Sequence, residues 1–445
     1  MIDRFSIARA CLLSFAMSAV AAVPVAAQET TSTTTQATAP ATAGGVEDLV
    51  RRALTANREL AAARIEIARA RARRQQATLL PNPVLEFEQT GGALGISKGE
   101  RERRAEISVP IEYGGKRGRR IDVAEAELRA TEAFVADRER RLAAEVRRLY
   151  AEAVAANREL SFTNELTQID AEIGNVLQVR VREGDAPPLE ESLLRVEIDR
   201  LRSRRAMLEG RRRAAELQLA TVIGLPANER IALADGYSEG VTVQTVEEAT
   251  RLALQNRPDL RAAELNIAAA EAGLRLANAQ ALPDISVFAG YANGRSGFDD
   301  TPVGPLVDQD KLINAGVGIS IPIFNRNQGA KAEAAAAIEQ ARRLRELTEL
   351  QIRAEVESAV ARYRAADAAV EVFRQGVLER SEQNVRTMRA AYEAGAFTIS
   401  EFLAERRRLV DAQRELTEAL TERAVALIDL QAAVAEPIEI NEEPK

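Results

Sequence analysis

A short alternating stretch that opens into a very long helical pattern is the feature that most constrains the fold. In residues 104–113 the apolar side chains fall on one face of a strand and the polar ones on the other, since side chains alternate sides along a strand. From Arg117 to about Arg182 there is no proline, and apolar residues recur every three or four positions. Such a helix is a rod of roughly 100 Å, far longer than a helix of a globular domain.

The chain contains this order of elements twice. Leu80-Pro81-Asn82 ends a first short helix, because a helix cannot continue through that segment, and Leu282-Pro283-Asp284 answers it in the second half. Each repeat is therefore predicted to hold a helix, a β-hairpin and a long helical hairpin. The predicted repeats span residues 46–245 and 246–435.

The second copy follows the first closely. An alternating run at 313–323 precedes a second rod, predicted from Lys331 to Tyr392. Gly184 ends the first rod and Gly395 ends the second, and after each glycine the chain returns as a further helix. Glycine allows the tight reversal that both rod ends need.

The amino terminus has the pattern of an export signal. Arg4 and Arg9 precede an apolar segment at 10–23, and small residues follow up to Ala27. This pattern predicts a signal peptide over residues 1–27, and its apolar segment is too short to be a spanning helix. We expect a flexible linker over 28–45, because this low-complexity segment has nothing to bury, and a similar tail over 436–445.

Composition argues against catalysis. The chain has no histidine and no tryptophan, and its one cysteine, Cys11, lies in the predicted signal peptide. The usual general base, metal ligand and nucleophilic thiol are therefore missing, so we expect no enzyme, no cofactor and no stored metal. The formal net charge of −7 disfavours nucleic acid as a partner. The basic run from Arg202 to Arg213 is interpreted as a solvated helix face with paired charges.

Four strands per chain pose a closure problem. Strands with one apolar face suit an outer-membrane barrel, although an ordinary half-buried strand of a soluble sheet has the same pattern. In lipid an open sheet edge is not tolerated, so the chain must oligomerise. Three copies supply twelve strands, which leave a conducting interior, whereas eight strands leave one filled by side chains. The alanine-rich rods are expected to line a hollow tube, the alternative being a solid coiled-coil spacer.

These features resemble the TolC-like outer-membrane efflux channels. The resemblance covers Val46 to Val434 and is carried by the duplication, the two Leu-Pro entries into the hairpins and the glycine at each rod tip. It implies a mainly α fold with a small β part: a homotrimer with a twelve-stranded barrel in the outer membrane and a long α-helical barrel in the periplasm. It also implies a periplasmic adaptor (membrane fusion) protein and an inner-membrane RND pump as partners.

Within that family, one segment is similar to a particular branch. Pro110-Ile111-Glu112 followed by Gly114-Gly115-Lys116-Arg117 is most like the branch that serves cobalt, zinc and cadmium efflux pumps. Its second-repeat counterpart, Pro322 to Arg326, is less distinctive. The glycine pair lacks the spacing of a phosphate-binding loop and is interpreted as the turn from strand into helix.

Polar residues opposite the apolar strand faces are candidates for the barrel lumen. Triplication of their carboxylates would form rings that favour cations, unless they merely solvate a wide pore. The predicted lumen residues are Glu86, Glu88, Glu106, Glu112, Asn314 and Ser320.

The rod tips are the second candidate site. The resemblance implies that the channel closes at this end and meets its adaptor there, and acidic residues could add an anionic constriction. The alternative is that the tips are only turns. The predicted tip residues are Glu183, Gly184, Asp185, Gly395 and Ala396.

The sequence thus predicts the outer-membrane channel of a tripartite efflux pump, a passive duct for divalent heavy-metal cations. One alternative is a multidrug or type I secretion channel of the same fold. Another, of a different class, is a periplasmic coiled-coil structural or adaptor protein, for which one helical hairpin and separate small β domains would be expected.

Overall fold

The computed structural model describes residues 42–43, 45–91, 101–226, 229, 231–233, 245–298 and 306–435. All helices and strands in these ranges belong to one compact unit, Pro40–Lys445. The predicted signal peptide and tail, and most of the predicted linker, lie outside the described residues.

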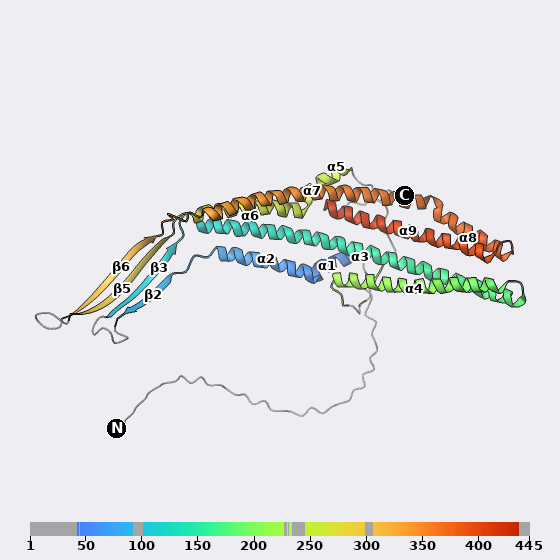
Figure 1. Cartoon of the computed structure of the whole chain (residues 1–445), viewed down its shortest axis with the longest axis horizontal. Coiled ribbons are helices and arrows are strands. Elements are labelled where there is room, and N and C mark those ends of the chain that lie inside the picture. Colours follow the sequence, from blue (N-terminus) through green and yellow to red (C-terminus); the bar gives the residue numbers. More distant parts are fainter. Residues whose placement is uncertain are drawn as a thin grey trace, which may run out of the picture. The chain divides into compact units, whose positions relative to one another are not determined.

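The first repeat has the predicted order of elements (Figure 1). Two short helices lead into a β-hairpin, and the hairpin leads into two long antiparallel helices. The elements are α1 (Val46–Ala56), α2 (Arg58–Ala77), β2 (Val84–Thr90), β3 (Arg101–Ile111), α3 (Lys116–Glu183) and α4 (Pro188–Val222).

The second repeat has the same order with one addition. A short π-helical segment, η1, stands between two parts of its long helix. The elements are α5 (Val246–Asn256), α6 (Pro258–Gln280), β5 (Ile285–Phe298), β6 (Leu306–Ile319), α7 (Gln328–Val372), η1 (Phe373–Val377), α8 (Leu378–Glu393) and α9 (Ile399–Val434). A short strand before the first repeat, β1 (Thr42–Ala43), pairs in parallel with β4 (Ile231–Ala232), which follows α4.

The first rod is confirmed as one helix of 68 residues. Its predicted apolar stripe is buried at Leu142, Val146, Ala153 and Leu160, because α3 packs along α2, α4, α6 and α9. The second rod is not the single helix that was predicted. It breaks at Gly376, whose φ of 102° is a left-handed conformation that glycine adopts without a Cβ clash.

The strand-to-helix turn is confirmed at the glycine pair. Gly114 and Gly115 have φ of 78° and 73°, and α3 begins at the next residue, Lys116. In the second repeat Asn327, with φ of 59°, occupies the same position before α7. Asparagine is among the residues that tolerate this conformation, so two different sequences make the same turn.

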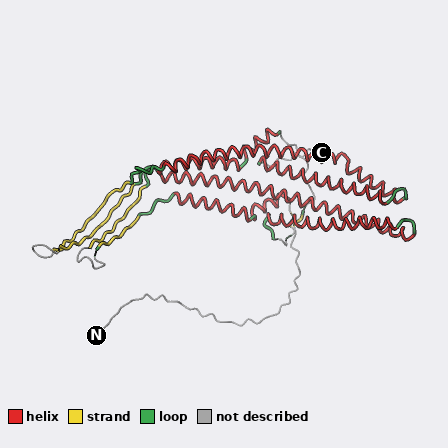
Figure 2. Tube along the Cα trace, viewed as in Figure 1, coloured by secondary structure: helices red, strands yellow, loops and turns green. Residues whose placement is uncertain are grey.

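The four long strands form one antiparallel sheet in the order β2-β3-β5-β6 (Figure 2). The register places Ala105 opposite Phe87 and Tyr291, and Ile313 continues that row. The next row, on the other face, holds polar and small residues. The outer strands β2 and β6 each have one neighbour among the described residues.

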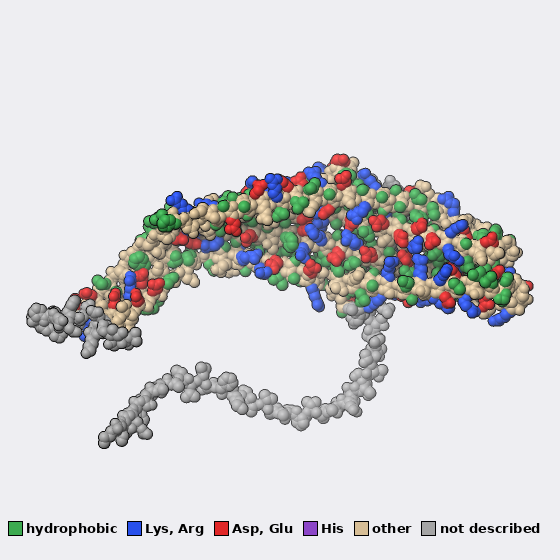
Figure 3. Space-filling view, viewed as in Figure 1, with side chains coloured by type: hydrophobic (Ala, Val, Ile, Leu, Met, Phe, Trp, Pro, Cys, Tyr) green, Lys and Arg blue, Asp and Glu red, His purple; other side chains and the backbone are tan. Residues whose placement is uncertain are grey.

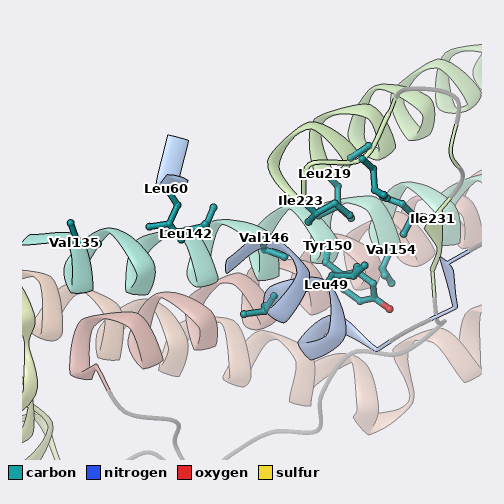
Figure 4. Close-up of a cluster of buried hydrophobic side chains, with 14 residues drawn as sticks. Leu49, Leu60, Val135, Leu142, Val146, Tyr150, Val154, Leu219, Ile223 and Ile231 are labelled. Carbon is teal, nitrogen blue, oxygen red and sulfur yellow. The ribbon is translucent and has the colours of Figure 1, made fainter. Parts of the chain in front are cut away.

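Two similar cores hold the helices together. In the first, Leu49 of α1 packs against Val146 of α3 and Leu219 of α4, all at most 1% exposed (Figure 4). The second joins α5, α7 and α9 around Ile352, Val356 and Leu430. Leucine and valine dominate the first core, whereas alanine and valine dominate the second.

The helix surfaces carry charges of both signs (Figure 3). The basic run of α4 is confirmed as paired: Arg202 lies 3.1 Å from Asp199, and Arg205 lies 2.8 Å from Glu209. No helix in the described part of the chain is long and apolar enough to cross a membrane.

Candidate functional site

The two helix tips are built alike. Gly184 (φ 86°) follows α3 and Gly395 (φ 76°) follows the end of α8. In both, the amide after the glycine donates to a carbonyl five residues back: Asp185 to Arg180 and Ala396 to Ala391, each at 2.8 Å. This pattern satisfies carbonyls that a helix end otherwise leaves free.

The predicted tip residues are exposed. Glu183 and Asp185 make no ion pair among the described residues. A Cβ added at Gly184 or Gly395 meets no atom within 4 Å. The tips therefore have room for a Cβ within the single chain, and the left-handed backbone opposes substitution there.

Side chains just behind the tips bind the two helical hairpins to each other. The hydroxyl of Tyr392 in α8 donates to Glu190 in α4 at 3.1 Å, and the guanidinium of Arg180 lies 5.4 Å from the Tyr392 ring centre. Burial, and then the hydrogen bond to Glu190, raise the pKa of Tyr392 to about 12. The phenol therefore keeps its proton at neutral pH and remains a donor to that carboxylate.

Apolar contacts surround this hydrogen bond. The Tyr392 ring stacks on Phe402 at 6.2 Å between ring centres. The buried side chains around it come from α3, α4, α8 and α9 and from the turn at Ala186, so both repeats contribute. Among them are Ile173, Leu177, Leu194, Ile399 and Leu403.

A buried charged cluster lies next to this contact. Arg406 of α9, 2% exposed, donates to Asp170 of α3, which is fully buried, and its guanidinium lies 3.9 Å from Glu197 of α4. Asp170 Oδ2 and Arg406 Nε find no hydrogen-bond partner among the described residues. Burial raises the pKa of Asp170, although the nearby guanidinium opposes that shift. The cluster joins one helix of the second repeat to two helices of the first.

Sequence reasoning missed this cluster, although a signal was present. Arg406 lies three or four positions from Leu403 and Leu409, and Asp170 lies in the same way between Leu166 and Ile173. Both charges therefore interrupt apolar stripes at positions that face the interior.

The sheet brings part of the predicted lumen set together. Glu86, Glu106 and Asn314 lie in one row across the strands, on the face opposite the apolar one. Glu106 accepts from Arg104 at 2.7 Å and from the Asn314 amide at 3.1 Å. Its charge is therefore already paired within the chain.

The other predicted lumen residues differ in their partners. Glu112 lies beyond the end of β3 and forms an ion pair with Arg120 of α3. Ser320 follows the end of β6, and its amide donates to Asp284. Glu86 and Glu88 are exposed and make no ion pair with any described residue. These two carboxylates therefore contribute uncompensated negative charge to this face.

The opposite face of the sheet exposes a continuous apolar surface. Phe87 is 78% exposed, Ile313 86% and Val317 61%. A single chain therefore leaves uncovered the face on which the sequence placed the apolar residues. An exposed apolar surface of this kind marks contact with lipid or with another protein.

A family model described as "Outer membrane efflux protein" matches residues 49–225 and 249–436. The cobalt-zinc-cadmium resistance protein CzcC of Cupriavidus metallidurans is 26% identical over 350 residues, which cover 77% of this chain and 77% of that protein. The pyoverdine export outer membrane protein OpmQ of Pseudomonas putida is 26% identical over 399 residues, 84% of this chain and 80% of that protein.

The fold is similar to that of solved channels. A CusC crystal structure superposes with a TM-score of 0.70 at 22% identity, covering 88% of this chain and 92% of that one. The predicted fold class is confirmed by this likeness together with the described helices and sheet.

We predict that Arg406→Met destabilises the packing of α9 against α3 by about 3–5 kcal/mol, because it leaves the fully buried carboxylate of Asp170 without its cation. The loss is measured as faster hydrogen exchange of α8 and α9 amides and a lower thermal midpoint. Arg406→Met with Asp170→Asn should recover part of it, and Arg408→Met, at a 77% exposed side chain, is the matched control.

The deficit should also depend on pH. A raised folded-state pKa means that the folded chain binds the proton more tightly than the unfolded chain, so the penalty of burying Asp170 shrinks as pH falls through that value. Removing Arg406 raises this pKa further. The deficit of Arg406→Met should therefore be smaller at about pH 5 than at about pH 8, and an equal deficit at both would contradict this account.

Proposed function

We propose that this chain, which belongs to the outer membrane efflux protein family, is the outer-membrane duct of a tripartite pump that exports divalent metal cations. It is an outer-membrane protein with a large periplasmic helical part. The observation that carries the proposal is the pair of open edges of its four-stranded sheet. A membrane-spanning sheet cannot leave these backbone groups unpaired, so a single chain is an incomplete channel.

Three copies give the simplest closure. Pairing β6 of one copy with β2 of the next is a head-to-tail contact, which generates a ring. Twelve strands leave an open lumen, with the polar face inward and the exposed row of Phe87 and Ile313 toward lipid. The long helices that follow each hairpin then line the periplasmic continuation of the same duct.

The helix tips are the proposed point of contact with the pump. A periplasmic adaptor would engage the exposed turns at Glu183-Gly184-Asp185 and Gly395-Ala396, and an inner-membrane RND transporter would supply the energy. Behind them, the Tyr392–Glu190 bond and the Arg406 cluster hold the two hairpins together. These contacts are the ones that must change if the hairpins separate. The duct itself performs no chemistry.

The metal assignment rests on three supports. CzcC is named for cobalt, zinc and cadmium resistance, the segment at Pro110–Arg117 is like that branch, and free carboxylates lie on the inner sheet face. The second candidate is export of an organic solute, because OpmQ, which is named for pyoverdine export, has the same 26% sequence identity to this chain as CzcC.

Deletion of the gene should sensitise cells to divalent metals. We expect growth to fail at lower zinc, cobalt or cadmium, while tolerance of dyes and antibiotics stays unchanged. Growth across graded metals and a drug panel, with a complemented strain as control, measures this. Sensitivity to organic compounds with normal metal tolerance would instead support the second candidate.

Bulky residues at the tips should block export without unfolding the chain. The Cβ of Gly184→Trp or Gly395→Trp meets no atom of the chain within 4 Å, so the bulk of the indole is added at the exposed tip where we propose that the adaptor binds. We expect Gly184→Trp to reduce metal tolerance to that of the deletion strain while trimers persist. Gly184→Asn is the control, because asparagine tolerates the left-handed backbone. Full metal tolerance in a strain that carries Gly184→Trp would mean that the tip is only a turn and does not contact an adaptor.

Glu86 and Glu88 should determine cation preference. We expect Glu86→Gln with Glu88→Gln to shift the reversal potential of bilayer-inserted channels toward zero under a salt gradient, since these two carboxylates are unpaired. Glu106→Gln is the comparison variant and should shift it less, because Arg104 already compensates that charge. Unchanged reversal potentials in both would mean that these side chains only solvate the lumen.

A further inference from the structure

One joint between the two repeats is fully formed within the chain. The Lys116 ammonium, at the start of α3, donates to the Leu282 carbonyl at 2.8 Å and to the Asp284 carboxylate at 2.6 Å. Lys116 is 7% exposed, so its charge depends on these partners. Beside it, a Cβ built on Gly114 lies 3.4 Å from the Leu282 Cβ. The turn that enters α3 therefore docks on the turn that leaves α6.

Because the chain is duplicated, each of the two turns that form this joint has a counterpart in the other repeat. The turn that enters α7 matches the one that enters α3, with left-handed Asn327 in the place of Gly115 and Gln328 in the place of Lys116. The turn that leaves α2 matches the one that leaves α6. Leu80 corresponds there to Leu282, and Asn82 corresponds to Asp284.

The two counterpart turns, the one that enters α7 and the one that leaves α2, do not contact each other within the chain. Leu80 is 68% exposed at the first turn, and Ile321 and Phe324 are 74% and 91% exposed at the second. Among the described residues, the Gln328 side chain bonds only within its own turn, accepting from the Arg326 amide and donating to the Phe324 carbonyl. Asn82 makes no side-chain hydrogen bond with any described residue. Arg117 and Arg120 of α3 donate to the Thr78 and Leu79 carbonyls of the first turn, but the apolar side chains of both turns are left uncovered.

The sheet topology indicates how these two turns could meet in an assembly of several copies. The turn after α2 begins edge strand β2, and the turn before α7 follows edge strand β6. They lie at opposite edges of the same four-stranded sheet. The formed joint lies between them, where β3 and β5 pair. A second copy that pairs its β2 with β6 brings the two uncovered turns together.

We propose that the turn entering α7 in one copy docks on the turn leaving α2 in the next, and that this contact repeats the joint formed inside the chain. Gln328 and Asn82 then take the places of Lys116 and Asp284, so the contact between copies is a neutral amide pair where the internal one is an ion pair. This inference rests on the proposed trimer and names the residues by which its copies recognise each other.

The first test uses a disulfide across the contact. Arg326 corresponds to Gly114 and Leu80 to Leu282, a pair whose Cβ spacing of 3.4 Å is close to the roughly 3.5–4.5 Å of disulfides. The single cysteine, Cys11, lies in the predicted signal peptide. Oxidised Leu80→Cys with Arg326→Cys should therefore run as covalent dimers and trimers on a non-reducing gel.

The controls separate this joint from the trimer itself. Leu80→Cys with Val317→Cys should not cross-link, because Val317 lies nine residues farther back along β6, roughly 30 Å in an extended strand. The mass of each variant in detergent is measured by light scattering. Trimers without the Leu80–Arg326 cross-link would overturn this joint and leave membrane lipid as the cover of Phe324. Absence of trimers would overturn the proposed function as well.

The second test copies the internal ion pair into the contact. Asn82→Asp with Gln328→Lys should raise the temperature at which trimers dissociate in sodium dodecyl sulfate by about 3 °C. Each single substitution should give no rise, because one unpaired charge is then introduced. A double variant no more heat-resistant than the singles would overturn the matching of these residues.

Discussion

Backbone hydrogen bonding at the edges of the sheet is the constraint on which the rest of the structure depends. β2 and β6 each lack one neighbour in the described chain, and a bilayer offers no group to replace it. The chain needs further copies for that reason, whatever its cargo. Each hairpin leads within a few residues into a long helix, so closing the sheet also brings helices of different copies side by side. The need to pair backbone groups at the sheet edges thus also assembles the helices into a periplasmic tube.

Duplication explains this architecture, but the two repeats differ in the contacts that matching positions make. Asn57 caps α2 by accepting from the Leu60 amide and donates to the Val222 carbonyl. At the matching position Arg257 is buried and binds Asp259 and Glu355, both at 2.5 Å. The long helix is continuous in the first repeat and broken at Gly376 in the second. The second hairpin therefore departs from the straight course of the first.

Buried charge gives the helix contacts a specificity that alanine and leucine stripes lack. Apolar stripes tolerate a slip along the helix, because one small apolar side chain replaces another at little cost. Arg406 between Asp170 and Glu197 does not, since a slip would leave buried charges unpaired. Lys116 acts similarly between the repeats.

The sequence by itself determined the duplication, the strands, the long helices and the turns at Gly114 and Gly184, because each depends on local periodicity or on a residue that permits a special backbone. Only the tertiary structure decided which charges are paired. Glu86 and Glu106 look alike in sequence, yet Glu106 is bound by Arg104 and Asn314, the latter brought in by strand pairing across the sheet. The Arg406 cluster escaped prediction because its partners, Asp170 and Glu197, come from distant helices. The break at Gly376 was also missed, because the helical periodicity continues on both sides of that glycine.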